Sequence, residues 1–205
     1  MPEIINLKKY KNKYRTDSIR LTGYDYSSEG VYFITILTKY RVHYFGSVSD
    51  GKMTLSTAGQ IVAQEWLKTF IKRERAVIGE WVVMPNHFHA LIGLKPNPVK
   101  DASHASLTST NRLKKDSDRY TLSIQDKVSA LNYKNSFGPQ SDNLSSIVRG
   151  FKGACTRQIR NTAVPEFKWH TGFYDHIVRN QASMTRIEEY IMENPLKWNK
   201  DRFYN

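Results

Sequence analysis

Short apolar runs rich in β-branched and aromatic residues, each bounded by turn residues, are the first pattern along the chain. Runs of this kind are typical of β-strands. They predict strands at 31–37, 44–48, 52–55, 76–83, 87–94 and 173–178. The second and third runs flank Ser49-Asp50-Gly51, and an Asp-Gly pair between two strands is a strong signal for a hairpin.

Segments in which apolar residues recur every three or four positions predict helices, because this spacing places them on one helix face. These segments are 58–70, 144–159 and 184–191. Thr57 with Gln60 forms a capping-box pattern at the start of the first helix. Asn180 or Ser183 is expected to cap the last helix, which Pro195 ends.

The order of these elements predicts an α+β fold in which helices pack on one face of an antiparallel sheet. The other face of such a sheet can be open to a ligand. We interpret the chain as a single domain, 1–205, with a basic N-terminal arm at 1–28. The polar segment at about 95–143 has no periodicity and is interpreted as an insertion, with a short helix expected near 123–131.

The charge of the chain indicates a polyanionic partner. Its 205 residues carry a formal net charge of +12, and nucleic acid is the commonest partner of so basic a protein. A membrane role is not expected, because no apolar run approaches the roughly 18 residues of a spanning helix. The single cysteine, Cys155, excludes an internal disulfide and lies in an apolar helical pattern, which favours a core thiol in a reducing, cytoplasmic compartment.

Two histidines at the start of the strand at 87–94 are candidate metal ligands. Alternate residues of a strand point to opposite faces, so His87 and His89 share one face while Phe88 points into the core. Two neutral imidazoles about 7 Å apart along a strand can converge on one divalent cation. Ordinary structural histidines are the alternative, but the apolar flanking residues mean that these rings need polar partners.

A tyrosine and an asparagine in the last predicted helix are the second candidate group. Tyr190 and Asn194 lie four residues apart and therefore share one helix face. A phenol can act as a nucleophile, and an amide oxygen beside it can complete a metal's ligand set. Half-buried packing is the alternative role for Tyr190, and Tyr174 is a second candidate nucleophile.

Basic residues on and after the helix at 144–159 are candidates for contacts with a nucleic-acid backbone. A solvated helix face is the alternative interpretation of such residues. We predict phosphate contacts from Arg149, Lys152, Arg160, Arg179 and Lys197.

At these positions the sequence resembles a known family. The stretch Met84–His89 resembles the HUH motif (His, hydrophobic, His) of the single-tyrosine transposases of small bacterial insertion sequences. The stretch Trp169–Trp198, above all residues 172–180 and 190–197, is closer to the REP-associated tyrosine transposases, which act on repetitive extragenic palindromes. The fold of that family is a ferredoxin-like or RRM-like antiparallel sheet.

The resemblance implies roles for four residues. His87 and His89 match the metal-ligand histidines, Tyr190 matches the nucleophile, and Asn194 falls at the position of a third polar ligand. Related insertion-sequence enzymes often carry glutamine at this last position.

The implied activity is nicking and rejoining of single-stranded DNA that carries hairpins, with Mg²⁺ or Mn²⁺ as cofactor. The tyrosine attacks the phosphorus and becomes a 5′-phosphotyrosine. The resemblance is compatible with a homodimer and with a monomer. Two other functions stay open: a non-catalytic RRM-like module that binds structured DNA or RNA, and a hydrolytic metallonuclease.

Overall fold

The computed structural model describes residues 9–10, 14–15, 21, 24–97 and 142–204. The helix expected near 123–131, most of the predicted insertion and most of the N-terminal arm lie outside the described residues. The chain divides into two compact units. The smaller unit includes the paired short strands β1 (Lys9–Tyr10) and β2 (Tyr14–Arg15), and the larger unit begins at Tyr26.

The larger unit contains the strands and helices that the hydrophobic pattern predicts for it, with ends that differ by a few residues. Its strands are β3 (Gly30–Leu37), β4 (Gly46–Ser49), β5 (Lys52–Leu55), β6 (Ala76–Met84), β7 (His87–Leu94) and β8 (Tyr174–Val178). Its α-helices are α1 (Thr57–Ile71), α4 (Leu144–Thr162) and α5 (Gln181–Glu193), and its 3-10 turns are η1 (Lys39–Arg41) and η2 (Trp198–Lys200). In the described part of the chain, every helix is too short or too polar to cross a bilayer.

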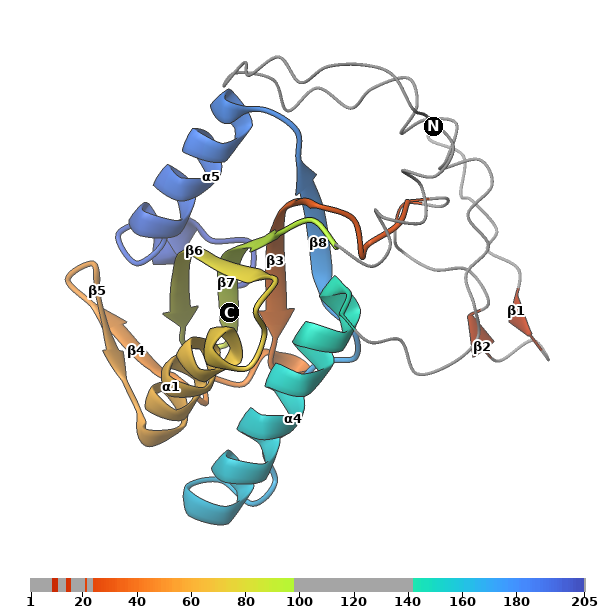
Figure 1. The fold of residues 1–205 in the computed structure, drawn as a ribbon. Helices are drawn as coiled ribbons and strands as arrows, with labels where there is room; N and C mark the ends of the chain where they lie inside the picture. Colours follow the sequence, from red (N-terminus) through yellow and green to blue (C-terminus); the bar gives the residue numbers. More distant parts are fainter. Residues whose placement is uncertain (1–8, 11–13, 16–20, 22–23, 98–141, 205) are drawn as a thin grey trace, which may run out of the picture. The chain divides into compact units, whose positions relative to one another are not determined.

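Four strands form one antiparallel sheet in the order β6-β7-β3-β8 (Figure 1). With α1 after β3 and α4 after β7, this is the β-α-β-β-α-β arrangement of ferredoxin-like folds. The predicted α+β fold is therefore confirmed. β4 and β5 form the predicted hairpin, and its turn residues Asp50 and Gly51 both adopt the positive φ angles that a tight hairpin turn requires.

The main core lies between this sheet and the helices α1 and α4, with Phe88 of β7 at its centre. The centroid of the Phe88 ring lies 5.0 Å from that of Trp66 on α1 and 5.4 Å from that of Phe151 on α4. All three side chains are buried. The prediction that helices pack on one face of the sheet therefore holds for α1 and α4. Helix α5 instead brings Tyr190 against His89, whose side chain points to the opposite face of the sheet from Phe88.

The start of α1 differs from the predicted capping box at Thr57 and Gln60. Ser56 is the N-cap: its backbone is extended, and its hydroxyl accepts a hydrogen bond from the backbone N–H of Gly59 at 3.1 Å. Thr57 is already helical. The prediction was wrong because Ser56 also offers a hydroxyl one residue earlier, where the chain leaves the hairpin in the extended conformation that an N-cap needs.

Truncation of the central core residue tests this packing. Phe88→Ala is expected to lower the free energy of unfolding by about 3–5 kcal/mol, because it leaves a cavity between β7 and both helices. Ile71→Ala is the control, since the Ile71 side chain at the end of α1 is 83% exposed, and a change of about 0.5 kcal/mol or less is expected. Urea unfolding measures both, and equal losses would contradict the described core.

Candidate active site

The tight turn between β6 and β7 delivers two histidines to one face of the sheet. His87 is the first residue of β7, and its ring and that of His89 are 0% and 1% exposed. The intervening Phe88 points into the core on the other face. Across the sheet, Thr35 of β3 lies directly opposite His89.

Both imidazoles are held in orientation through their Nδ1 atoms. Nδ1 of His87 lies 2.9 Å from Oδ1 of Asn86, and Nδ1 of His89 lies 2.8 Å from Oγ1 of Thr35. Each ring is therefore fixed from one side, and its Nε2 atom faces away from these partners. Orientation of one ring nitrogen by a second residue is the usual arrangement of metal-binding histidines.

Helix α5 places a tyrosine directly against the second histidine. The helix begins at its cap Asn180, one of the two predicted caps, whose side chain accepts the N–H of Ser183. The hydroxyl of Tyr190 lies 3.1 Å from Nε2 of His89, and its ring packs edge-on against Phe33. Tyr190 is 39% exposed, so its hydroxyl is positioned by the site while the ring remains accessible from solvent.

Asn194 lies one turn after Tyr190 and is buried in the same place. Its Nδ2 donates to Oδ2 of Asp201 at 3.2 Å. Among the described residues, neither Oδ1 of Asn194 nor Nε2 of His87 finds a hydrogen-bond partner, although both atoms are buried. Two buried acceptors without a donor are costly, and a bound cation is the kind of ligand that satisfies both.

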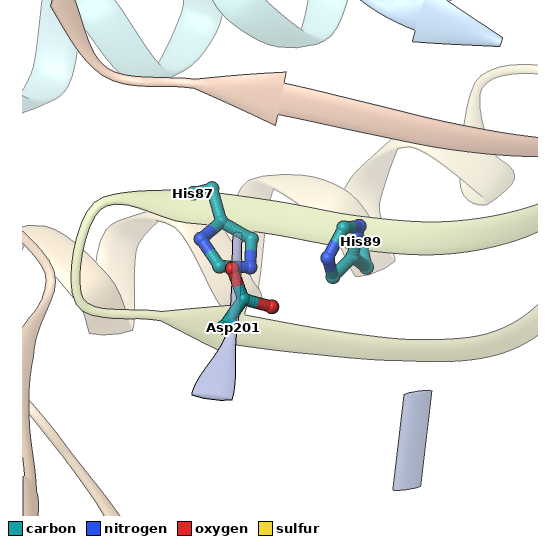
Figure 2. A group of neighbouring side chains, drawn as sticks. All are labelled: His87, His89 and Asp201. Carbon is teal, nitrogen blue, oxygen red and sulfur yellow. The ribbon is translucent and has the colours of Figure 1, made fainter. Parts of the chain in front are cut away.

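Asp201 is a site residue that the sequence reasoning missed. It follows η2, and its Oδ2 accepts a hydrogen bond from the Tyr190 hydroxyl at 3.3 Å. Ligand atoms of His87, His89 and Asp201 lie within 4.8 Å of one another, and Figure 2 shows the carboxylate on the same side of β7 as the two rings. A lone aspartate beyond the end of the last helix has no periodicity or motif to mark it.

The donor set suits a divalent cation at neutral pH. Burial lowers the pKa of His87 to about 4, although the nearby carboxylate of Asp201 acts in the opposite direction. Burial also holds the pKa of His89 well below its ordinary value, and His87 beside it adds to that effect. Both rings are therefore neutral at pH 7 and have a lone pair for a metal. Imidazole nitrogens, a carboxylate and an amide oxygen are all common ligands of divalent metals in proteins.

The phenol of Tyr190 is not activated by the protein alone. Burial, together with the negative charge of Asp201, raises its pKa to about 12. A cation held by His87 and His89 would act in the opposite direction, because positive charge favours the phenolate. The Tyr190 hydroxyl is thus positioned beside the histidines, and the surrounding protein favours its protonated form.

Tyr174, the second candidate nucleophile, lies farther from the histidines. It is on β8 opposite Thr35, so β3 separates it from His89. Tyr174 nevertheless lines the same cavity of about 500 Å³ as His89 and Tyr190. It is 45% exposed and can contact a substrate there.

Two of the predicted phosphate-binding residues hold the protein's own backbone. Nζ of Lys152 donates to the carbonyls of His170 at 2.8 Å and Gly172 at 2.7 Å, and burial lowers its pKa to about 8. Nε of Arg160 donates to the carbonyl of Phe167 at 2.9 Å. These contacts attach the loop before β8 to α4.

The three other predicted phosphate contacts are at the surface. Lys197 forms an ion pair with Glu193 one helical turn earlier. Arg149 and Arg179 are exposed. Phosphate binding by all five basic residues stays a prediction.

Comparison with known proteins shows relatives in sequence and in fold. No family model matches the chain. A Haemophilus influenzae protein described as uncharacterized is 32% identical over 187 residues, which cover 91% of this chain and 92% of the relative. The structure of a REP-associated tyrosine transposase bound to a REP hairpin matches with a TM-score of 0.53 and 18% identity, over 91% of this chain and 76% of that one. The fold resemblance drawn from the sequence is therefore confirmed.

Metal binding is expected to stabilise the folded chain. Millimolar Mn²⁺ should raise the unfolding temperature of the wild type, since a ligand at about 100 times its Kd adds about 2.7 kcal/mol. His87→Ala should lose this increase. His170→Ala is the matched control, because the structure uses the backbone of His170 in its contacts with Lys152 and Leu37. An equal increase in all three proteins would contradict the site.

The metal-free chain is expected to lose stability as the pH falls from about 6.5 to about 4. When the pH falls below 6.5, the ordinary pKa of histidine, a histidine of the unfolded chain takes up a proton. His87 of the folded chain stays neutral until about pH 4. Protonation therefore favours unfolding throughout this window, and above pH 6.5 His87 has no effect. Urea unfolding in a chelator at several pH values measures the slope; constant stability from pH 7 to pH 4.5 would contradict the described burial.

Proposed function

The chain belongs to one family with the uncharacterized Haemophilus influenzae protein, and we propose that it is a metal-dependent transposase that nicks and rejoins single-stranded DNA through Tyr190. The single observation that carries this proposal is the distance of 3.1 Å between the Tyr190 hydroxyl and Nε2 of His89. These atoms lie in a cluster where two buried acceptors have no donor among the described residues. A nucleophile and a metal-ligand pair from distant parts of the sequence meet at one point.

The described residues divide the chemistry among them. His87, His89, Asn194 and Asp201 would hold a divalent cation, Mg²⁺ or Mn²⁺, which neutralises charge on the scissile phosphate when bound. Tyr190 lies beside this group, and its hydroxyl donates a hydrogen bond to Asp201. The carboxylate can therefore take the phenol proton when the oxygen attacks.

The step conserves bonds and protons. The Tyr190 oxygen forms a bond to phosphorus, and the bond from phosphorus to the 3′-oxygen breaks. The proton that passes from Tyr190 to Asp201 is then available to the departing 3′-hydroxyl. The product is a 5′-phosphotyrosine, which a second 3′-hydroxyl can attack to rejoin the strand.

Single-stranded or hairpin DNA is the proposed substrate. The net charge of +12 favours a polyanion, and the REP-associated tyrosine transposase of the same fold is bound to a REP hairpin. Such a role implies a cytoplasmic location. A monomer suffices for the chemistry, because Tyr190 and both histidines come together within one chain.

A covalent protein–DNA adduct is the direct test of the activity. Wild-type protein with Mn²⁺ and 3′-labelled hairpin oligonucleotides, with randomised single-stranded flanks, should give a labelled adduct that survives denaturing electrophoresis. Tyr190→Phe and His87→Ala should reduce the adduct below detection, and a chelator should do the same. Tyr174→Phe is the matched control and should retain it.

The other functions predict different results in this experiment. A binding module would retain the hairpins, with or without chelator, and cut none of them. A hydrolytic metallonuclease would release free 5′-phosphate ends without attached protein. Loss of the adduct in Tyr174→Phe and not in Tyr190→Phe would assign the nucleophile to β8 instead of α5.

A further inference from the structure

A second pocket opens beside the Tyr190 site. It has a volume of about 390 Å³ and is lined mainly by η1 and the loop before β8. Tyr174 and Phe203 line both this pocket and the cavity that contains His89 and Tyr190. The two cavities therefore adjoin at these two side chains.

The η1 segment at the edge of this pocket has a strained backbone. Tyr40 and Arg41 both have positive φ angles, 59° and 56°, which residues with a β-carbon rarely adopt. Neighbouring hydrogen bonds fix this conformation. The N–H of Lys39 donates to the carbonyl of Lys168 at 2.8 Å, and the hydroxyl of Thr38 donates to the carbonyl of Val42 at 2.8 Å. Strain that the surrounding structure maintains is typical of ligand-binding segments.

The ring that this segment displays has little packing. Tyr40 is 81% exposed, and Nζ of Lys39 lies 4.9 Å from its ring centroid. Glycine would relieve the backbone strain at this position, and a polar side chain would expose no aromatic ring to solvent. Folding therefore gains nothing evident from a tyrosine here, which favours a role in binding.

Cations and aromatic rings lie together where this pocket meets the cavity of His89 and Tyr190, which Arg202 lines. The guanidinium of Arg202 lies 5.5 Å from the Tyr174 ring and 4.5 Å from the Phe203 ring, and that of Arg41 lies 5.8 Å from Phe203. Aromatic faces that bases can stack on, beside cations that contact phosphates, are the general arrangement of single-strand binding sites. The pocket is also of the size that small-molecule sites have.

We propose that this pocket binds one unpaired nucleotide next to the scissile phosphate, with its base stacked on Tyr40 and its phosphate near Lys39 and Arg41. The proposal rests on the proposed function for the position of the scissile phosphate at Tyr190. Binding of the base itself depends only on the pocket. The Tyr40 pocket would therefore align the strand for attack.

Equilibrium binding separates base stacking from backbone contacts. The probes are a fluorescein-labelled twelve-nucleotide oligothymidylate and an abasic strand of the same length, measured by anisotropy in the Tyr190→Phe background, where no cleavage interferes. Adding Tyr40→Gly should weaken oligothymidylate binding by about tenfold and leave abasic binding unchanged. Its unfolding temperature should be equal or higher, because glycine accepts the positive φ.

Tyr204→Ala is the matched control, since Tyr204 is a half-exposed aromatic residue that packs against Trp198. It should leave both affinities unchanged. Photocrosslinking of a 5-iodouracil strand, followed by mass spectrometry, should place the crosslink on Tyr40. Equal oligothymidylate binding with and without Tyr40→Gly would overturn the proposal, and so would an equal loss for both strands.

The results also distinguish this proposal from the proposed activity. If wild-type protein gives no covalent adduct but Tyr40→Gly still weakens binding of the base-bearing strand alone, the pocket stands and the transposase activity falls. If the adduct forms normally and Tyr40→Gly changes no affinity, the activity stands and the pocket falls.

Discussion

The alternation of side chains along β7 is the constraint on which both the core and the site depend. Phe88 is held between Trp66 and Phe151 on one face of the sheet. This contact determines that His87 and His89 point to the other face, toward Tyr190. A slip of one residue in the pairing of β7 would exchange the faces, placing a phenyl ring in the site and two imidazoles in the core.

The site itself is assembled at a cost in free energy of folding. Two buried acceptors, on His87 and Asn194, lack donors among the described residues, and both imidazoles are kept neutral by burial. Water would satisfy these groups in the unfolded chain. The burial that makes the nitrogen lone pairs available to a metal therefore also makes the metal-free site less favourable. The proposed metal binding would therefore be coupled to stability through the same few atoms.

Much of the fold could be predicted from the sequence, because strand alternation and helical spacing are local signals. The face shared by His87 and His89 follows from the strand period, and the alignment of Tyr190 with Asn194 follows from the helical one. Asp201 could not be found in this way. It enters the site through a turn after α5, and no period relates residues across a turn.

Local sequence patterns do not decide which partner a side chain binds, or which of two neighbouring residues caps a helix. Lys152 is on the polar side of a helix, and sequence alone cannot distinguish a phosphate from a backbone carbonyl as its partner. The carbonyls of His170 and Gly172 are seen only once the loop before β8 is placed. The Ser56 cap is a similar case, because its neighbour Thr57 offers the same hydroxyl, and only the path of the chain decides between them.

The hydrogen bond between Thr35 and His89 determines which tautomers the imidazole ring can adopt. While the Tyr190 hydroxyl donates to Asp201, the proton between Tyr190 and His89 belongs to Nε2 of the imidazole, and Nδ1 must accept from Thr35. Coordination through Nε2 requires the other tautomer, in which Nδ1 carries the proton. A hydroxyl can rotate from donor to acceptor without moving its oxygen. Thr35 therefore accommodates both tautomers, whereas a backbone carbonyl in its place would permit one alone.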